Sequence, residues 1–161
     1  MGQQPVGRQR RWARLGASLG AIALVMALGL MLGASGAIAS PAPPETVAIH
    51  LGSVAGDLRF EPDQLSFRAG QRYRLVLDNP SPEKHYFTAK DFADGLWTQK
   101  VQAGGVEVKG AIHELELKPG ATAEWVFVPE RPGTYALHCA IAGHAEAGMV
   151  GQLEIEAAGQ G

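Results

Sequence analysis

Apolar and polar residues alternate in short segments over most of the chain. In residues 72–79 (RYRLVLDN), Tyr73, Leu75 and Leu77 occupy every second position, and residues 113–120 (HELELKPG) repeat the pattern. Because successive side chains of a strand point to opposite faces, this period of two predicts half-buried strands in antiparallel sheets.

Six further segments have the composition of short strands: TVAIHLGS (46–53), QLSFRAG (64–70), HYFTAK (85–90), TAEWVFVPE (122–130), GTYALHC (133–139) and GQLEIEA (151–157). Residue pairs such as Asn79-Pro80 and Pro119-Gly120 mark the turns between strands. Only residues 91–100 (DFADGLWTQK) suggest a short helix. Seven or eight strands of this length predict an all-β sandwich.

The N-terminal part of the chain has a different pattern. Four arginines between residues 8 and 14 precede an uncharged, mostly apolar run over residues 15–39, and a proline-rich break follows at residues 40–44. A basic flank, an apolar run and the A-x-A motif of Ala37 and Ala39 are typical of a secretory signal. The run also exceeds the ~20 residues that span a bilayer, so an uncleaved membrane anchor is the alternative.

These boundaries predict three parts: a signal or anchor over residues 1–39, a linker over residues 40–44, and one domain over residues 45–161. The Arg10-Arg11 pair leaves both the general and the twin-arginine export routes open. Either way, the domain is expected to be exported, as a periplasmic protein or on the outer face of the cytoplasmic membrane.

The charge of the chain after residue 39 indicates which classes of partner the domain can bind. The whole chain carries 14 basic and 16 acidic residues, and four of the basic ones lie before residue 40, so the rest has 10 against 16 and a formal charge of −6. Nucleic-acid binding requires a basic face, which this balance argues against. An acidic domain is expected to meet basic or neutral protein partners.

The chain contains a single cysteine, Cys139. An exported protein with one cysteine cannot form an internal disulfide, and a free thiol in an oxidising compartment must be accounted for. Burial as a small apolar residue, pairing with another chain and metal ligation are the three explanations.

Strand phase indicates where the side chains around Cys139 point. In residues 133–139, Cys139 is in phase with the apolar positions and faces inward, whereas His138 faces outward. The chain then runs through an Ala/Gly-rich loop containing His144 and resumes an inward position at Met149. One loop thus offers a thiol, an imidazole and a thioether as metal ligands.

A fourth ligand must come from another segment. His85 is in phase with the apolar Phe87 and directly follows a turn, so it is the best candidate. His50 alternates with apolar neighbours and is expected to be exposed. His113 could face inward, but no other ligand lies near it in the sequence. Two imidazoles, a thiolate and a weak thioether suit a mononuclear copper, because zinc sites rarely use thioether.

These residues carry a family resemblance. The segment CAIAGHAEAGM reads C-x4-H-x4-M and, with His85 upstream and GTY before the cysteine strand, resembles the cupredoxins azurin, plastocyanin and rusticyanin over residues 45–157. The resemblance implies an eight-stranded Greek-key β-sandwich with one type 1 copper held by His85, Cys139, His144 and Met149. Tyr86 stands where azurin and plastocyanin have asparagine.

The resulting expectation is an exported blue-copper electron carrier rather than an enzyme. It would pass single electrons between redox protein partners in transient complexes, with His144 and the small residues around it as the contact surface, and would associate with a membrane only if residues 15–39 are retained. Two alternatives remain. The domain could be a periplasmic copper carrier, or an oxidoreductase with a second copper at His138, since a His-Cys pair also resembles copper nitrite reductases, which however have two domains and a longer loop.

Overall fold

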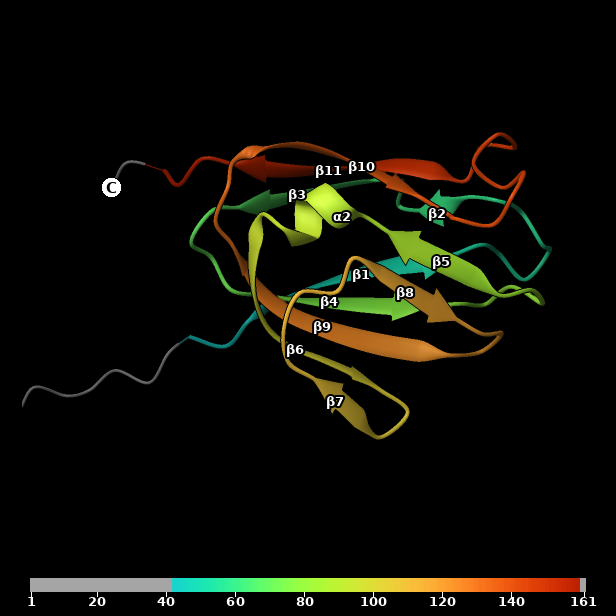
Figure 1. Cartoon of the computed structure of the whole chain (residues 1–161), viewed down its shortest axis with the longest axis horizontal. Coiled ribbons are helices and arrows are strands. Elements are labelled where there is room, and N and C mark those ends of the chain that lie inside the picture. The colour runs from blue at the N-terminus through green and yellow to red at the C-terminus, as the bar shows by residue number, and fades with distance from the viewer. Residues whose placement is uncertain (1–41, 160–161) are drawn as a thin grey trace, which may run out of the picture. The chain divides into compact units, whose positions relative to one another are not determined.

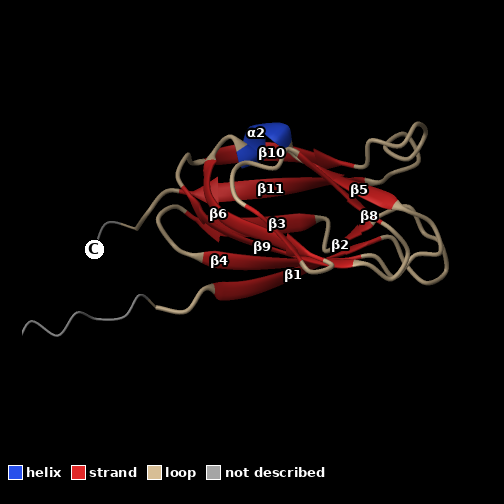
Figure 2. Cartoon of the chain, turned by 60° about the horizontal axis from the view of Figure 1, so that its bottom comes forward, coloured by secondary structure: helices blue, strands red, loops and turns tan. Residues whose placement is uncertain are grey.

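A computed structural model of the chain describes residues 42–159, which form two sheets packed face to face (Figures 1 and 2). The proposed signal or anchor and the start of the linker lie outside the described residues. The elements are β1 (Glu45–Leu51), β2 (Phe60–Glu61), β3 (Gln64–Arg68), β4 (Tyr73–Asp78), β5 (His85–Thr88), α2 (Lys90–Ala93), β6 (Leu96–Ala103), β7 (Val106–Val108), β8 (Glu114–Leu117), β9 (Thr122–Pro129), β10 (Gly133–His138) and β11 (Val150–Glu156).

The predicted β-sandwich is confirmed. One sheet has the order β2-β1-β4-β9-β6-β7 and the other the order β3-β11-β10-β5-β8, so the chain crosses repeatedly from one sheet to the other. Each of the eight alternating segments contains a strand. In the part of the chain that the structure describes, no helix is long and apolar enough to cross a membrane.

Apolar and polar residues alternate along these strands because each sheet buries only one of its faces. In β4 buried and half-buried residues alternate, whereas buried and exposed residues alternate in β3 and in the second half of β11. The buried faces meet in an aromatic cluster of Phe67, Phe92, Trp125 and Phe127, in which the centroids of neighbouring rings lie 5.4–6.2 Å apart. Rings of this size bury large apolar areas, and tilted and edge-to-face contacts add to the gain from burial.

The helix predicted for residues 91–100 is mostly wrong. Only Lys90–Ala93 is helical, and residues from Leu96 onward form β6, which pairs with β9 along its length. A β-bulge between Thr98 and Lys100 shifts the side-chain phase within the strand, so the sequence shows no clean alternation. The short strands β2 and β7 were also not predicted, because segments of two or three residues carry no period.

Four of the connections between strands lie at one end of the sandwich, on the right in Figure 1. They are residues 52–59, 79–84, 118–121 and 139–149. Asn79 links two of them, since its backbone N–H donates to Ala121 O (3.0 Å) and its carbonyl accepts from Gly120 N–H (2.8 Å). This end also receives His85 and Cys139 from their strands.

Asn79 orders the turn that leads to His85. Its buried side-chain amide donates to the carbonyl oxygens of Glu83 and Leu117, both at 2.8 Å, and its side-chain oxygen accepts from Ser81 N–H at 2.9 Å. Asn79→Ala is therefore expected to lower the free energy of unfolding by about 2–3 kcal/mol, because buried backbone groups lose their partners. Denaturant unfolding of the copper-free protein measures this loss.

Ser53 provides the matched control for Asn79. Its hydroxyl also makes three hydrogen bonds within a turn, to Ala55 N–H, Asp57 N–H and the Asp57 carboxylate, but these bonds are exposed. Water can replace them, so Ser53→Ala is expected to change stability by less than about 1 kcal/mol. Equal losses in the two variants would contradict the role assigned to Asn79.

Candidate metal centre

Three of the four predicted ligands converge at the loop end of the sandwich. His85, Cys139 and His144 each offer a ligand atom, and these atoms lie within 4.8 Å of one another. Cys139 Sγ is 3.6 Å from His144 Nδ1, and the rings of His85 and His144 have centroids 5.3 Å apart. Residues 85 and 139–144 thus meet across the fold, as expected for ligands of one ion.

The three side chains differ in exposure. His85 and Cys139 are buried, with 0% and 1% of their surface exposed, whereas His144 is half-buried. His85 begins β5, and Cys139 directly follows β10, so both are fixed by the sheet. His144 lies on the loop and is the member of the group nearest to solvent.

His85 gives the strongest indication that this group is a metal site. Both ring nitrogens are buried and neither has a hydrogen-bond partner. A buried polar atom without a partner costs about 1–3 kcal/mol, so native proteins rarely leave one. A metal ion bonded to one nitrogen would remove part of this cost.

The surroundings of His85 indicate which nitrogen faces the group. A Cβ placed on Gly52 would lie 2.8 Å from Nε2 and 3.1 Å from Cδ2, so the backbone at Gly52 covers that edge of the ring and leaves the Nδ1 side for a ligand. Burial, together with the neighbouring His144, lowers the pKa of His85, although Glu83 opposes the shift. The imidazole is therefore neutral at pH 7, which is the state that binds metals.

Met149, the fourth predicted ligand, is fully buried beside this group. Its carbonyl accepts from Cys139 N–H (3.1 Å), and its own N–H donates to His144 O (2.9 Å). These bonds close the loop, so Met149 is held next to both residues by the backbone. Its role as an axial ligand stays a prediction.

The donor set fits one copper ion. A thiolate, two imidazoles and a thioether combine soft and borderline ligands, which suits an ion that alternates between Cu(I) and Cu(II). Zinc sites accept cysteine and histidine but seldom methionine. Among residues 42–159, no other group of three or more His, Cys, Asp or Glu side chains converges in this way.

The remaining histidines lie apart from this group. His50 is exposed, as predicted, and its Nδ1 is 2.6 Å from the carboxylate of Asp78. The suggestion that His113 could face inward is wrong, because it precedes β8 and turns to the surface, where it pairs with Asp94 at 2.7 Å. His138 faces outward, as predicted.

Sequence reasoning missed two contributors to the site. Gly52 covers His85, and the backbone N–H of Tyr86 donates to Cys139 Sγ at 3.4 Å. A glycine directly after the apolar run of β1 was a usable signal for Gly52, since it marks a position where two segments approach closely. No side-chain pattern could reveal a backbone donor.

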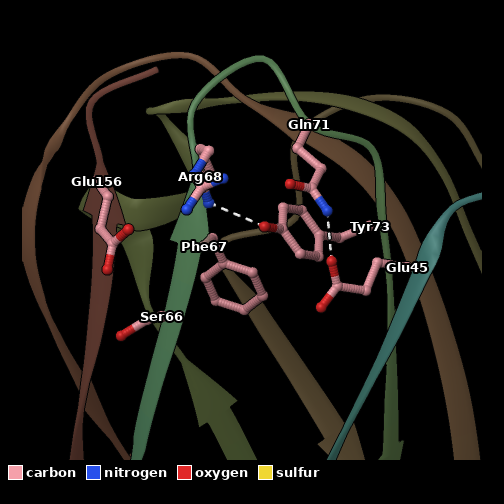
Figure 3. A pocket seen from close by; sticks show the side chains of 7 residues that line it. All are labelled: Glu45, Ser66, Phe67, Arg68, Gln71, Tyr73 and Glu156. Carbon is pink, nitrogen blue, oxygen red and sulfur yellow. Dashed lines mark hydrogen bonds between the residues drawn. The ribbon is translucent and has the colours of Figure 1, made fainter. Parts of the chain in front are cut away.

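A polar hollow with a volume of about 360 Å³ lies at the end of the sandwich opposite the candidate metal centre. Figure 3 shows the side chains that line it. Its residues bond one another, because Tyr73 Oη accepts from Arg68 N–H (2.9 Å) and the Gln71 amide donates to the Glu45 carboxylate. The lining contains no histidine, cysteine or methionine, so this pocket has none of the ligands that copper favours.

The family model described as "Cupredoxin-like domain" matches residues 21–150. The chain belongs to the cupredoxin family. Cupredoxins bind copper, and the group of His85, Cys139 and His144, with Met149 beside it, could hold one copper ion.

Individual relatives are similar to this chain in sequence, and a solved structure is similar to it in fold. A copper-resistant cuproprotein CopI from Pseudomonas aeruginosa is 26% identical over 83% of this chain and 95% of the relative. A plastocyanin from Prochlorothrix hollandica is 30% identical over 73% and 79%. A copper-containing nitrite reductase from Thermus scotoductus superposes with a TM-score of 0.53 at 18% identity, over 71% of this chain but only 31% of the enzyme.

Proposed function

We propose that this cupredoxin carries single electrons between redox proteins. The observation that supports the proposal most is the convergence of Cys139 and His144 on a buried His85 whose nitrogens have no other partner. Copper bound there would supply a one-electron Cu(I)/Cu(II) couple. Ligands fixed by strands and by a hydrogen-bonded loop keep nearly the same positions in both states, so little rearrangement opposes each transfer.

His144 is the proposed point of electron entry and exit, because it is the half-buried member of the group. Small residues surround it, and Ile141 and Ala145 are half-buried while Glu146 is the single charge of residues 140–147. A small, largely apolar contact surface suits brief redox encounters. The proposed partners are redox proteins that meet this surface.

Copper loading tests the proposal. The loaded protein is expected to bind one copper per chain, to show an intense visible absorption in the oxidised state, and to give a reversible one-electron wave in voltammetry. A colourless copper complex, or an irreversible wave, would count against electron transfer.

Copper delivery is the second candidate, favoured by the similarity to copper-resistant CopI over 95% of that protein. A copper carrier must release its ion, whereas a carrier of electrons retains it. Transfer of Cu(I) to a chelator within the time of mixing would favour delivery, and retention over hours would favour electron transfer.

We propose that the chain is not an enzyme. The copper nitrite reductases that the His138-Cys139 pair resembles have two cupredoxin domains and a much longer loop from cysteine to histidine, whereas only four residues separate Cys139 from His144. The enzyme hypothesis expects two coppers per chain and the loss of one in His138→Ala. We expect a ratio of one in both proteins.

We also propose that the domain is exported. The support is the basic flank, apolar run and A-x-A motif of residues 8–39, which precede the described part of the chain. The mass of the protein recovered from the periplasm and from the membrane fraction distinguishes a cleaved signal from a retained anchor.

A further inference from the structure

Tyr86 connects the proposed copper centre to the outer face of the sheet. Its backbone N–H donates to Cys139 Sγ at 3.4 Å, while its side chain, one residue out of phase with the buried His85, points away from the core. The ladder between β5 and β10 has the register pair Thr88–His138. Beyond that pair, the N–H to sulfur bond joins β5 to the start of the 139–149 loop.

On its other side, β5 is held by β8. Tyr86 lies directly opposite Glu116 in the antiparallel pair, and its hydroxyl donates to the Glu116 carboxylate. Lys84 Nζ lies 3.3 Å from the same carboxylate and 5.5 Å from the centre of the Tyr86 ring. Lys84, Tyr86 and Glu116, here called the Tyr86 cluster, thus bond to one another across the edge of the sheet.

We propose that the Tyr86 cluster positions the Tyr86 N–H on the Cys139 sulfur and thereby tunes the reduction potential of the bound copper. This inference rests on the proposed function, because it requires copper at Cys139. A hydrogen bond to the sulfur withdraws electron density from the thiolate and weakens its donation to Cu(II). Loosening that bond should therefore favour Cu(II) and lower the potential.

The geometry explains why the side chains matter for a backbone bond. β8 is the last strand of its sheet, and an edge strand has a neighbour on one side only. Cross-strand side-chain pairs are a main source of stability for such a pair of strands. Removing the pair Tyr86–Glu116 leaves the end of β5 held by main-chain bonds to β8 and by the sulfur bond itself.

The decisive variant is Tyr86→Phe, which removes the hydroxyl and leaves every charge in place. In the copper-free protein, hydrogen exchange of the residue-86 amide is expected to become about threefold faster, the size of effect that an exposed side-chain hydrogen bond supports. In the copper-loaded protein, the potential should fall and the deuterium shift of the copper–sulfur stretching band should shrink. If the hydroxyl of Tyr86 has a purely structural role, its loss would change overall stability but neither the reduction potential nor the deuterium shift.

Thr88→Val is the matched control. Thr88 Oγ1 donates to the Glu114 carboxylate at 3.0 Å, which is the same kind of cross-strand bond, two register pairs along the same two strands. Neither the residue-86 amide nor the potential should change in this variant. Equal changes in both variants, or wild-type values in Tyr86→Phe, would overturn the proposal.

Glu116→Ala separates position from charge. Losing a carboxylate near copper raises the potential by itself, so the amide exchange rate is the relevant readout, and it should match that of Tyr86→Phe. Glu114→Ala removes an equivalent charge from β8 and should leave the exchange rate unchanged. If copper fails to bind at all, the proposed function fails, while the exchange rates of the copper-free proteins still decide whether the cluster positions the amide.

Discussion

Cys139→Ser is expected to abolish the intense visible absorption of the copper-loaded protein. That absorption requires a thiolate bonded to Cu(II), and a serine hydroxyl stays protonated and is a much harder donor. Copper affinity should fall more than about 100-fold, because even residues that only support a ligand contribute 10–100-fold. Optical titration with Cu(II) and competition with a Cu(I) chelator measure the two effects.

The fold is expected to survive this substitution. Serine is close to cysteine in size, and its oxygen can accept the bond that Tyr86 N–H gives to Cys139 Sγ. A buried hydroxyl in place of the thiol costs about 1–3 kcal/mol, less than the stability of an ordinary domain. Unchanged circular dichroism of the copper-free protein would show that the loss of colour reflects the ligand.

Met149→Leu is the matched comparison for the cysteine variant. Met149 is fully buried, and leucine nearly conserves its volume, so the packing loss should be below about 1.5 kcal/mol. As a weak, distant ligand, the thioether is expected to set the potential rather than the colour, so the variant should stay intensely coloured with a shifted potential. A coloured Cys139→Ser variant would show that the ligand assignment is wrong.

The sequence predicted the site well where potential metal ligands lie close together in the chain and the alternation of strand residues shows which way they point. Cys139, His144 and Met149 lie within one loop, so their spacing alone suggested a common site, and strand phase correctly placed His138 outside and His85 inside. The same alternation predicted eight strands and the sandwich. Each of these inferences uses residues that are close together along the chain.

The sequence-based predictions failed where the structure depends on contacts between segments that are distant in sequence. The strand β6 is stabilised by pairing with β9 along its length, and a β-bulge interrupts the alternation of apolar and polar residues in its sequence. His113 has the phase of an inward residue but turns outward to Asp94, which is nineteen positions earlier in the chain. The contact between Gly52 and His85 is of the same kind, because only the folded chain brings β1 and β5 together.

Gly52→Ala is expected to lower both the stability of the protein and its affinity for copper, although it changes no ligand. Gly52 is buried and has a φ of +78°, and an added Cβ would lie 2.8 Å from both His85 Nε2 and the Ser81 Cβ. Real Cβ atoms do not approach other atoms so closely, so the His85 ring or the turn at Ser81 must move. His85 is itself fully buried, so a shift of its ring also disturbs the residues packed around it.

The expected cost has two parts. Alanine in the left-handed region costs about 1–2 kcal/mol, and overpacking a filled site adds about 1–3 kcal/mol. Unfolding of the copper-free variant should therefore show a loss of about 3 kcal/mol. Displacement of the His85 ring should also weaken copper binding about 10–100-fold, as for other changes that misplace a ligand.

Gly56→Ala separates the two parts. Gly56 lies in the same connection between β1 and β2, has a φ of +86°, and an added Cβ there would meet nothing within 4 Å. This variant should lose only the backbone part of the stability and bind copper as the wild type does. The difference between the two alanine variants therefore measures the contact with His85 and Ser81. If they lose equal stability and equal copper affinity, Gly52 has no role in holding the ligand.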